Sequence, residues 1–360
     1  MDSSFAAWKL LQTGAEVIGV HLYRGKFDSM AEGPQSIGNK EREGAEKAAA
    51  WLGIPLHVVD VSGRFEDEVI RYFAKSYGMG LTPNPCVVCN PRIKIRVMEE
   101  VARRQGADAI TTGHHARVKY DPDRQRYCLL QGARKQKDQS YFLARLSPLQ
   151  LEKLILPAGW YAKESIREEL RQEGFVNFDK AESQDICFVD TTGYQNIVEK
   201  ILQNETPPEG DIVDTEGRVL GRHPGIHHFT IGQRKGLGIP TPEPYYVVEI
   251  DPANKRVIVG PRESTYNEEA LVRELHWTAG PPGPDEQIQV KIRYKSGRTS
   301  CRLSFPRPDT AVVHFKKPQR AVTPGQFAVF YSHSEVLGSG VFARMSERED
   351  GLVGRKGTLL

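Results

Sequence analysis

Two patterns of apolar and polar residues divide the chain near its middle. In the first half, stretches with apolar side chains at helical spacing alternate with short apolar runs that are typical of buried strands. The predicted helices cover residues 5–11, 41–52 and 65–77, and the predicted strands cover 16–22, 56–61 and 109–112. This alternation predicts an α/β fold with a doubly wound parallel sheet. Because active residues in such sheets gather where strands end, we expect a cleft near Leu22 and Gly113.

The second half of the chain has short β-rich runs instead. A Thr-Pro-Pro-Glu-Gly linker begins at Thr206, and glycine and proline recur at small intervals after it. Runs at 211–219, 245–250 and 256–259 predict a small β domain, and 287–331 alternates as a β-barrel or sandwich would. We therefore predict a doubly wound domain followed by two small β-rich domains, the last of them barrel-like. Their predicted bounds are 1–205, 206–275 and 276–360.

One run in the predicted barrel, residues 290–295, alternates apolar and basic side chains. Val290, Ile292 and Tyr294 would share one face of a strand, and Lys291, Arg293 and Lys295 the other. By itself this pattern favours a solvated edge strand whose lysines oppose aggregation. A phosphate-contacting surface is the alternative interpretation.

The most distinctive stretch, residues 81–94, carries two cysteines on a proline-rich loop. Asn90 and Pro91 suit the N-cap and the first position of a helix that continues with apolar side chains at helical spacing until Gly106. This interpretation places Cys89 at a helix N-terminus, close in sequence to Arg92 and Lys94. We therefore expect a lowered pKa for the Cys89 thiol.

The Cys86-x-x-Cys89 pair has several interpretations: half of a structural zinc site, a redox disulfide, a reactive or cluster-binding pair, or coincidence. A structural zinc site needs a second close pair of ligands, which Cys128, Cys187 and Cys301 do not form. We therefore favour a reactive or cluster-binding role for this cysteine pair over a structural zinc site. Cys128 and Cys301 lie on strand-like stretches and are predicted to be packing residues.

Composition narrows the class of protein. A chain of 360 residues with 39% hydrophobic and 26% charged residues is typical of a globular protein of two or three domains. No apolar run approaches a membrane span and no signal peptide is recognisable, so we predict a cytoplasmic protein without membrane contact. The formal net charge is only +3, so any nucleic-acid-binding surface must be local.

Six motifs in register identify a resemblance. They begin at Asp2 (Asp-Ser-Ser), Thr82 (Thr-Pro-Asn-Pro-Cys-x-x-Cys-Asn), Thr112 (Thr-Gly-His-His-Ala-Arg), Lys137 (Lys-Asp-Gln-Ser-Tyr-Phe), Ile186 (Ile-Cys-Phe) and Phe229 (Phe-Thr-Ile-Gly-Gln-Arg-x-Gly-Leu-Gly). Together they resemble the tRNA-specific 2-thiouridylases, the MnmA family of the PP-loop ATP pyrophosphatase superfamily. The resemblance covers essentially the whole chain and implies ATP-dependent 2-thiolation of the wobble uridine of tRNA.

Two departures from the family pattern carry expectations. The family's loop begins with a strand and Ser-Gly-Gly, neither of which is in this sequence, so we expect Met1 to be an internal methionine of a longer product and the sequence as it stands to bind ATP poorly. Many family members also carry Asp where this chain has Cys86. Cys86, Cys89 and Cys187 then resemble the three ligands of a four-iron four-sulfur cluster in some tRNA-thiolating relatives.

The resemblance implies a role for each matching residue. Cys89 is the expected nucleophile and Cys187 the expected persulfide carrier, with a transient disulfide between them; the cluster route stays open beside this one. A cysteine desulfurase or a sulfur-relay protein would supply the sulfur. ATP would contact Asp2, Ser3, Ser4, Leu22 and Gly113, with Mg²⁺ on its phosphates. The target base would meet Asn84, Pro85 and Cys86, and tRNA would contact His114, Lys137, Asp138, Gln139, Arg293, Tyr294 and Gln326.

Two other functions remain under consideration. One is a different AMP-forming ligase of the same superfamily, which would need no paired cysteines. The other is a tRNA-binding protein without catalysis, because half of the phosphate-binding loop is not in the sequence.

Overall fold

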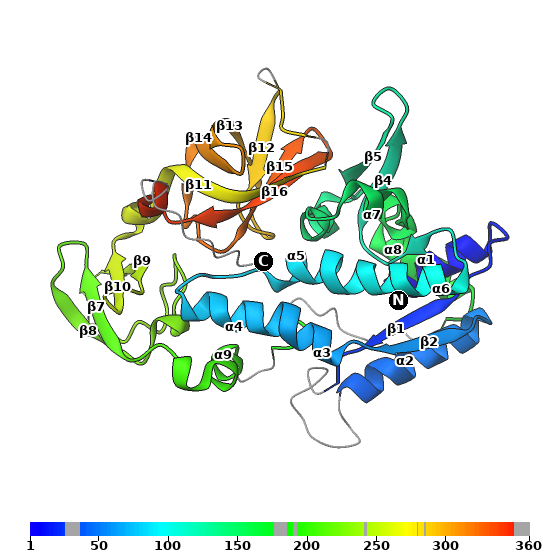
Figure 1. The fold of residues 1–360 in the computed structure, drawn as a ribbon, viewed down its shortest axis with the longest axis horizontal. Helices are drawn as coiled ribbons and strands as arrows, with labels where there is room; N and C mark the ends of the chain where they lie inside the picture. The colour runs from blue at the N-terminus through cyan, green and yellow to red at the C-terminus, as the bar shows by residue number, and fades with distance from the viewer. Residues whose placement is uncertain are drawn as a thin grey trace.

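The computed structural model describes residues 1–25, 37–175, 186–189, 193–240, 243–278, 280–283 and 286–348. Asp185, beside the Ile186-Cys-Phe motif, lies outside them. The first part of the chain alternates helices and strands as predicted (Figure 1). Its elements are α1 (Asp2–Leu11), β1 (Gly19–Tyr23), α2 (Ile37–Leu52), β2 (Leu56–Asp60), α3 (Ser62–Phe65), α4 (Arg71–Gly78), α5 (Pro85–Cys89), α6 (Arg96–Gln105), β3 (Ile110–Thr111), β4 (Ala116–Asp121), β5 (Arg126–Gln131), α7 (Pro148–Glu152), β6 (Leu154–Ile155), α8 (Lys163–Gln172) and α9 (Gln195–Leu202).

The parallel sheet consists of two separate pairs of strands. β1 pairs in parallel with β2, and β3 pairs in parallel with β6. A cavity of ≈ 610 Å³ lies between the pairs and is lined by α1, β1, α2, α6 and β3, including Val20, Ala49, Val101 and Ile110. Among the described strands, β1 and β3 have no partner on the side of this cavity. We call this cavity the strand slot.

Two long helical segments run side by side through the middle of the molecule (Figure 1). π-Helical turns at Glu66–Ile70 and Asn90–Ile95 join α3 to α4 and α5 to α6. The predicted helix start at Asn90 is wrong: the helix begins at Pro85, with Asn84 as its N-cap. Pro91 is tolerated inside it because the turn is widened there, and the Asn90 side chain donates hydrogen bonds to the carbonyls of Cys86 and Phe142, both at 3.0 Å.

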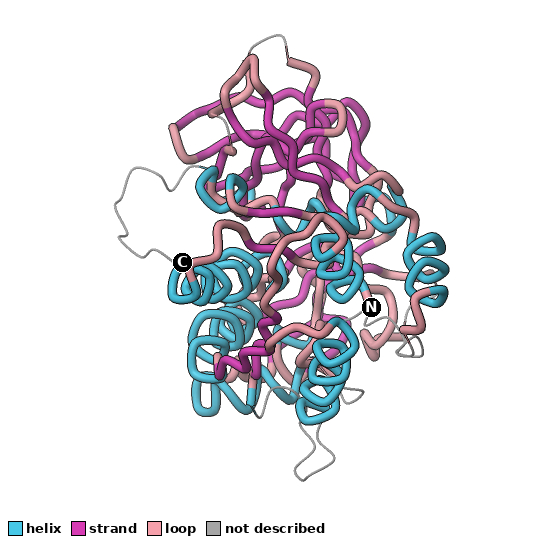
Figure 2. Tube along the Cα trace, turned by 90° about the vertical axis from the view of Figure 1, so that its right-hand side faces the viewer, coloured by secondary structure: helices cyan, strands magenta, loops and turns pink. Residues whose placement is uncertain are grey.

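The remaining chain forms the two predicted β domains. The central one is a four-stranded sheet in the order β8-β7-β10-β9, built from β7 (Gly210–Asp214), β8 (Val219–His223), β9 (Tyr246–Asp251) and β10 (Arg256–Gly260). The last one is the group of strands at the top of Figure 2. It is a closed barrel in the order β11-β14-β13-β12-β15-β16, because β16 also pairs with β11. Its strands are β11 (Tyr266–Trp277), β12 (Ile288–Lys291), β13 (Arg298–Arg307), β14 (Thr310–Arg320), β15 (Phe327–Ser332) and β16 (Glu335–Ala343). The predicted barrel is confirmed, and its first strand starts within the range assigned to the central domain.

The predicted strand at 290–295 is shorter than expected. β12 ends at Lys291, whose side chain is 9% exposed and whose ammonium lies over the rings of Tyr141 (5.9 Å) and Tyr294 (5.2 Å). The Arg293 guanidinium turns back to donate hydrogen bonds to the Arg320 and Ala321 carbonyls. The expected continuous basic face is therefore wrong, because aromatic rings and main-chain carbonyls draw these cations inward.

No helix among the described residues combines the length and the apolar composition needed to cross a bilayer.

Candidate active site

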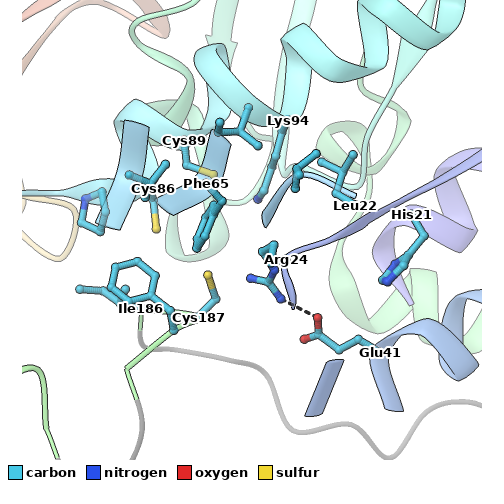
Figure 3. Close-up of a pocket in the computed structure, with 15 residues that line it drawn as sticks. His21, Leu22, Arg24, Glu41, Phe65, Cys86, Cys89, Lys94, Ile186 and Cys187 are labelled. Carbon is cyan, nitrogen blue, oxygen red and sulfur yellow. Dashed lines mark hydrogen bonds and ion pairs between the residues drawn. The ribbon is translucent and has the colours of Figure 1, made fainter. Parts of the chain in front are cut away.

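Three cysteines from distant parts of the sequence meet at one cavity of ≈ 280 Å³ (Figure 3). Cys86 and Cys89 come from α5, one helical turn apart, so both sulfurs lie on the same side of the helix. Cys187 comes from the segment 186–189, which faces that side. The structure therefore brings together the three thiols that the sequence analysis singled out.

Phe188 holds Cys187 in place. Its ring packs edge-on against Phe65 (centroids 5.8 Å apart) and Phe73 (5.1 Å) in the helical core, while Cys187 itself is exposed. A cysteine in a short apolar run such as Ile186-Cys-Phe188 is by default an inert core residue. Its neighbour takes the core position instead and leaves the thiol at the cavity.

The electrostatics of the buried thiols differ from the sequence-based expectation. Burial raises the pKa of Cys86 to about 11 and that of Cys89 to about 12, with Lys94 opposing the shift and the other thiols adding to it. The expected lowering at Cys89 is wrong because this residue lies in the second turn of a helix that starts at Pro85, inside the protein. In the free protein both groups are neutral thiols near pH 7.

Two cations complete the cavity. Arg24, just after β1, forms an ion pair with Glu41 at 2.6 Å, and its charge also acts on Cys89. The exposed Lys94, on the π-helical turn, acts on Cys86, Cys89 and His114. Sequence reasoning missed Arg24 as a site residue, although its place directly after a strand was a usable signal.

The N-terminus of α1 lies beside the loop that follows β3. Asp2 faces His115 (Nε2–Oδ2 3.5 Å) and Lys163 (Nζ–Oδ2 3.8 Å). Burial alone would raise the pKa of Asp2, but the nearby His115 imidazole and the Lys163 ammonium outweigh it and lower that pKa. A Cβ on Gly113 would collide with the backbone of Asp2 and Ser3, so glycine is required for this close approach.

The other residues expected at the nucleotide occupy two places. Leu22 lies on β1 and lines the thiol cavity. Ser3 and Ser4 line the strand slot, and Ser4 is buried.

His114, an expected tRNA contact, lies on the loop after β3. Its ring forms a hydrogen bond with Thr112 Oγ1 at 2.7 Å, and burial, with help from Lys94, lowers the pKa of His114 to about 3. The imidazole of His114 is therefore neutral at physiological pH.

The loop before the cysteine helix is held by the barrel. Gln326 Nε2 donates hydrogen bonds to the carbonyls of Thr82 (2.9 Å) and Pro83 (3.3 Å), and Thr82 N–H donates to the Pro324 carbonyl (2.9 Å). Gly325 lies against Leu81 and Thr82 with φ +91°, where a Cβ would come within 2.9 Å of Thr82 N. These contacts fix the approach to Asn84, Pro85 and Cys86.

The predicted tRNA contacts differ in exposure. Asp138 is 2% exposed, and its carboxylate accepts hydrogen bonds from Gln131, Gly132 and Ser140. Gln139 accepts from His115 N–H at 2.9 Å and is half-buried, as is Lys137. In the barrel, the Tyr294 ring packs on Phe142 with centroids 4.2 Å apart. Asp138 thus shapes the loop from inside, whereas Lys137 and Gln139 reach the surface.

Comparisons with known proteins agree with this architecture. Family models match residues 1–191 (tRNA methyl transferase HUP domain), 195–261 (tRNA methyl transferase PRC-barrel domain) and 267–342 (Aminomethyltransferase beta-barrel domain). The chain is 41% identical to the tRNA-specific 2-thiouridylase MnmA of Trichormus variabilis, over 96% of this chain and 97% of the relative. It is 40% identical to the MnmA of Syntrophotalea carbinolica, over 95% of this chain and 96% of the relative. It is 41% identical to the MnmA of Chloroflexus aggregans, over 96% of each chain. With this similarity along nearly its whole length, the chain belongs to the MnmA family of tRNA-specific 2-thiouridylases.

Proposed function

We propose that this protein replaces the C2 oxygen of the wobble uridine of tRNA with sulfur, at the expense of ATP. The observation that carries the proposal is the convergence of Cys86, Cys89 and Cys187 on one cavity. Sulfur transfer needs thiols that can reach one another and a substrate, and three thiols lining one cavity support such a mechanism.

Activation of the base comes first in the proposed reaction. The C2 oxygen of uracil belongs to a urea-like carbonyl and is a poor leaving group. Attack of this oxygen on the α-phosphorus of ATP releases pyrophosphate and leaves an adenylated base, from which AMP departs readily. Elimination of AMP after attack at C2 carries the original oxygen away.

The residues around α1 fit part of the nucleotide. First-turn amides of this helix suit a phosphate, and Gly113 lets the loop after β3 lie directly against this end of the helix. Asp2 Oδ1 is buried without a hydrogen-bond partner, so this carboxylate is the candidate ligand for Mg²⁺, which would neutralise phosphate charge. Leu22 would contact the nucleotide from the cavity side.

Sulfur transfer follows in the persulfide route. A desulfurase or relay protein places a second sulfur on Cys187, and the terminal sulfur attacks C2 as AMP leaves. The Cys89 thiolate then attacks Cys187 Sγ, which breaks the sulfur–sulfur bond and leaves the terminal sulfur on the base. The product disulfide joins Cys89 and Cys187, and a cellular thiol reductant restores both thiols. Because burial raises the pKa of Cys89, its proton must leave in this step, and Lys94 favours the charged form.

An iron–sulfur route is the alternative for the same reaction. Cys86, Cys89 and Cys187 are a suitable donor set for a four-iron four-sulfur cluster, which would leave one iron free to hold sulfide. Anaerobic purification followed by iron analysis separates the routes. A colourless, iron-free and active protein contradicts the cluster, and loss of activity in Cys86→Ser together with loss of iron supports it.

Recognition of tRNA is proposed to use the surface around the cavity entrance. The wobble base must leave the anticodon stack to reach Cys89, which places Asn84, Pro85 and Cys86 beside it. Lys137, Gln139 and His114 would meet the anticodon region, and Arg293, Tyr294 and Gln326 would act from the barrel. The burial of Asp138 supports a positioning role for it within this loop.

Mass spectrometry of tRNA nucleosides tests the function. In a strain that lacks the gene we expect loss of 2-thiouridine derivatives, restored by the wild-type gene but not by Cys89→Ser or Cys187→Ser. Cys301→Ser is the matched control, because Cys301 and Cys89 are each 9% exposed and Cys301 lies in the barrel core. Unchanged 2-thiouridine in the deletion strain contradicts the proposal. Full activity of Cys89→Ser supports another ligase, and tRNA binding without thiolation supports a binding protein.

A further inference from the structure

Three potential metal ligands meet where α9 packs against the segment that leads to the central sheet. Glu199 lies on α9, and His227 and His228 lie on a short helical turn, η8 (Ile226–His228), before the sheet strand β9. Glu199 Oε1 is 3.3 Å from His227 Nε2 and 3.4 Å from His228 Nε2. One ligand atom from each of the three residues lies within 4.8 Å of the other two.

These distances fit metal coordination better than hydrogen bonding. N–H···O hydrogen bonds cluster near about 2.9–3.0 Å, and the His314–Glu269 pair elsewhere in this protein is shorter, at 2.7 Å. The edge of a tetrahedron with zinc–ligand bonds of about 2.0–2.1 Å is about 3.3 Å. Both nitrogen–oxygen distances at Glu199 match that edge.

The surroundings of His227 are also unusual. Its side chain is 1% exposed, and its Nδ1 atom is buried without a hydrogen-bond partner. Its other nitrogen, Nε2, shares one carboxylate oxygen with a second imidazole. A metal–nitrogen bond at Nε2 would replace this long, shared hydrogen bond with a stronger interaction.

We propose that Glu199, His227 and His228 form a binding site for a divalent transition metal, with zinc as the best fit. Two imidazoles and a carboxylate suit zinc, cobalt or nickel, whereas calcium and magnesium prefer oxygen ligands. Three protein ligands leave a fourth position for water. Such a metal clips α9 to the central domain, and α9 begins eight residues after Cys187 (195 − 187). The site is independent of the thiol cavity and of the proposed thiolation.

Metal titration of the purified full-length chain tests the proposal. The protein is stripped with a chelator and carries Cys86→Ser, Cys89→Ser and Cys187→Ser, so that the thiols do not bind the metal. We expect it to bind one equivalent of Zn²⁺ by calorimetry and to melt at a higher temperature when Zn²⁺ is present. With Co²⁺ as the probe, we expect the absorption of a tetrahedral site without thiolate charge-transfer bands.

Variants then locate the metal. In the same background, His228→Gln and Glu199→Gln should weaken Zn²⁺ binding at least tenfold and abolish the rise in melting temperature. Both side chains are partly exposed, so the variants are expected to fold. His314→Gln is the matched control, a histidine bonded to one glutamate, and should bind Zn²⁺ as the parent does. The proposal is overturned if the parent binds no Zn²⁺, or if His228→Gln and Glu199→Gln bind it as tightly as the parent.

Discussion

At the scale of single residues, the site is governed by competition between burial and charge. Cys86 and Cys89 lie in an apolar cavity that disfavours a thiolate, while the Lys94 ammonium favours it. Burial is the larger effect, so the free enzyme keeps neutral thiols that are protected from wasteful oxidation.

Thiol alkylation should show this competition directly. Since only the thiolate reacts and the pKa of Cys89 is raised to about 12, its reaction with iodoacetamide should be slow at pH 8 and should still accelerate above pH 9. Peptide mapping by mass spectrometry at several pH values measures the rate at each cysteine. A rate for Cys89 that reaches a plateau below pH 9 contradicts the raised pKa.

Replacing Lys94 tests the positive charge that counteracts the effect of burial on the thiol pKa. Lys94→Met keeps much of the side-chain volume but removes the positive charge, so the pKa of Cys86 and Cys89 should rise further. At a fixed pH near 9, alkylation of both cysteines should slow at least severalfold, whereas Lys94→Arg should react nearly as the wild type does. Equal rates in the Met and Arg variants would show that Lys94 does not act through its charge.

At the scale of elements, the sequence predicted the helices and strands that depend only on the local pattern of apolar residues. The helices at 41–52 and 65–77 and the strand at 56–61 follow from apolar periodicity, and the structure has them within a few residues. The helix start before Cys86 was missed because Asn84-Pro85 and Asn90-Pro91 carry the same N-cap and N1 signal, so the local pattern does not choose between them. Only the tertiary contact from Asn90 to Phe142 shows that Asn90 is interior. The end of β12 at Lys291 likewise depends on Tyr141, which lies 150 residues earlier (291 − 141).

Contact between two loops should be tested with glycine substitutions. Gly325→Ala places a Cβ against Leu81 and Thr82 at a backbone φ of +91°, so we expect lower stability and displacement of the loop before Cys86. Gly217→Ala is the control, because its φ of +84° imposes similar backbone strain with no atom within 4 Å of the new Cβ. Thiolation should fall more in Gly325→Ala than in Gly217→Ala. Equal activity of the two variants would show that the loop contact does not matter for the site.

The strand slot offers a second test at this scale. An apolar strand of Val and Ile fused ahead of Met1 could enter the slot and pair with β1 and β3, whose edges there are unpaired among the described strands. Each buried Val or Ile side chain contributes about 1.5–3 kcal/mol, so the melting temperature should rise by several degrees. A Gly-Ser extension of equal length is the control and should leave it unchanged. Identical melting of the two fusions contradicts the idea that the slot accepts a strand.

At the scale of the whole molecule, the β domains hold the site together from outside. The barrel contacts the loop before Cys86 through Gln326, and the hairpin β4–β5 joins the barrel where Leu130 pairs with Glu335. Through these contacts, residues after Tyr266 support a cavity that is lined by residues between His21 and Phe188. A separate catalytic domain would lose both supports.

The carboxylate of Glu335 links the hairpin to the barrel through two arginines. It bonds Arg126 at 2.7 Å and Arg124 at 3.0 Å, and its side chain is 11% exposed. Glu335→Ala leaves Arg126 without this partner and should destabilise the protein by about 3–5 kcal/mol, the usual effect of breaking a buried ion pair. Arg124→Ala, at a side chain 53% exposed, should cost less than about 1 kcal/mol.

Urea unfolding, followed by fluorescence and by circular dichroism, measures both variants. Because Glu335 links two domains, Glu335→Ala should also separate the unfolding of the barrel from that of the first domain, so that the two signals no longer coincide. Arg124→Ala should keep the transitions of the wild type. If Glu335→Ala and Arg124→Ala unfold at the same urea concentration, the hairpin and the barrel are held together by their apolar contacts rather than by this carboxylate.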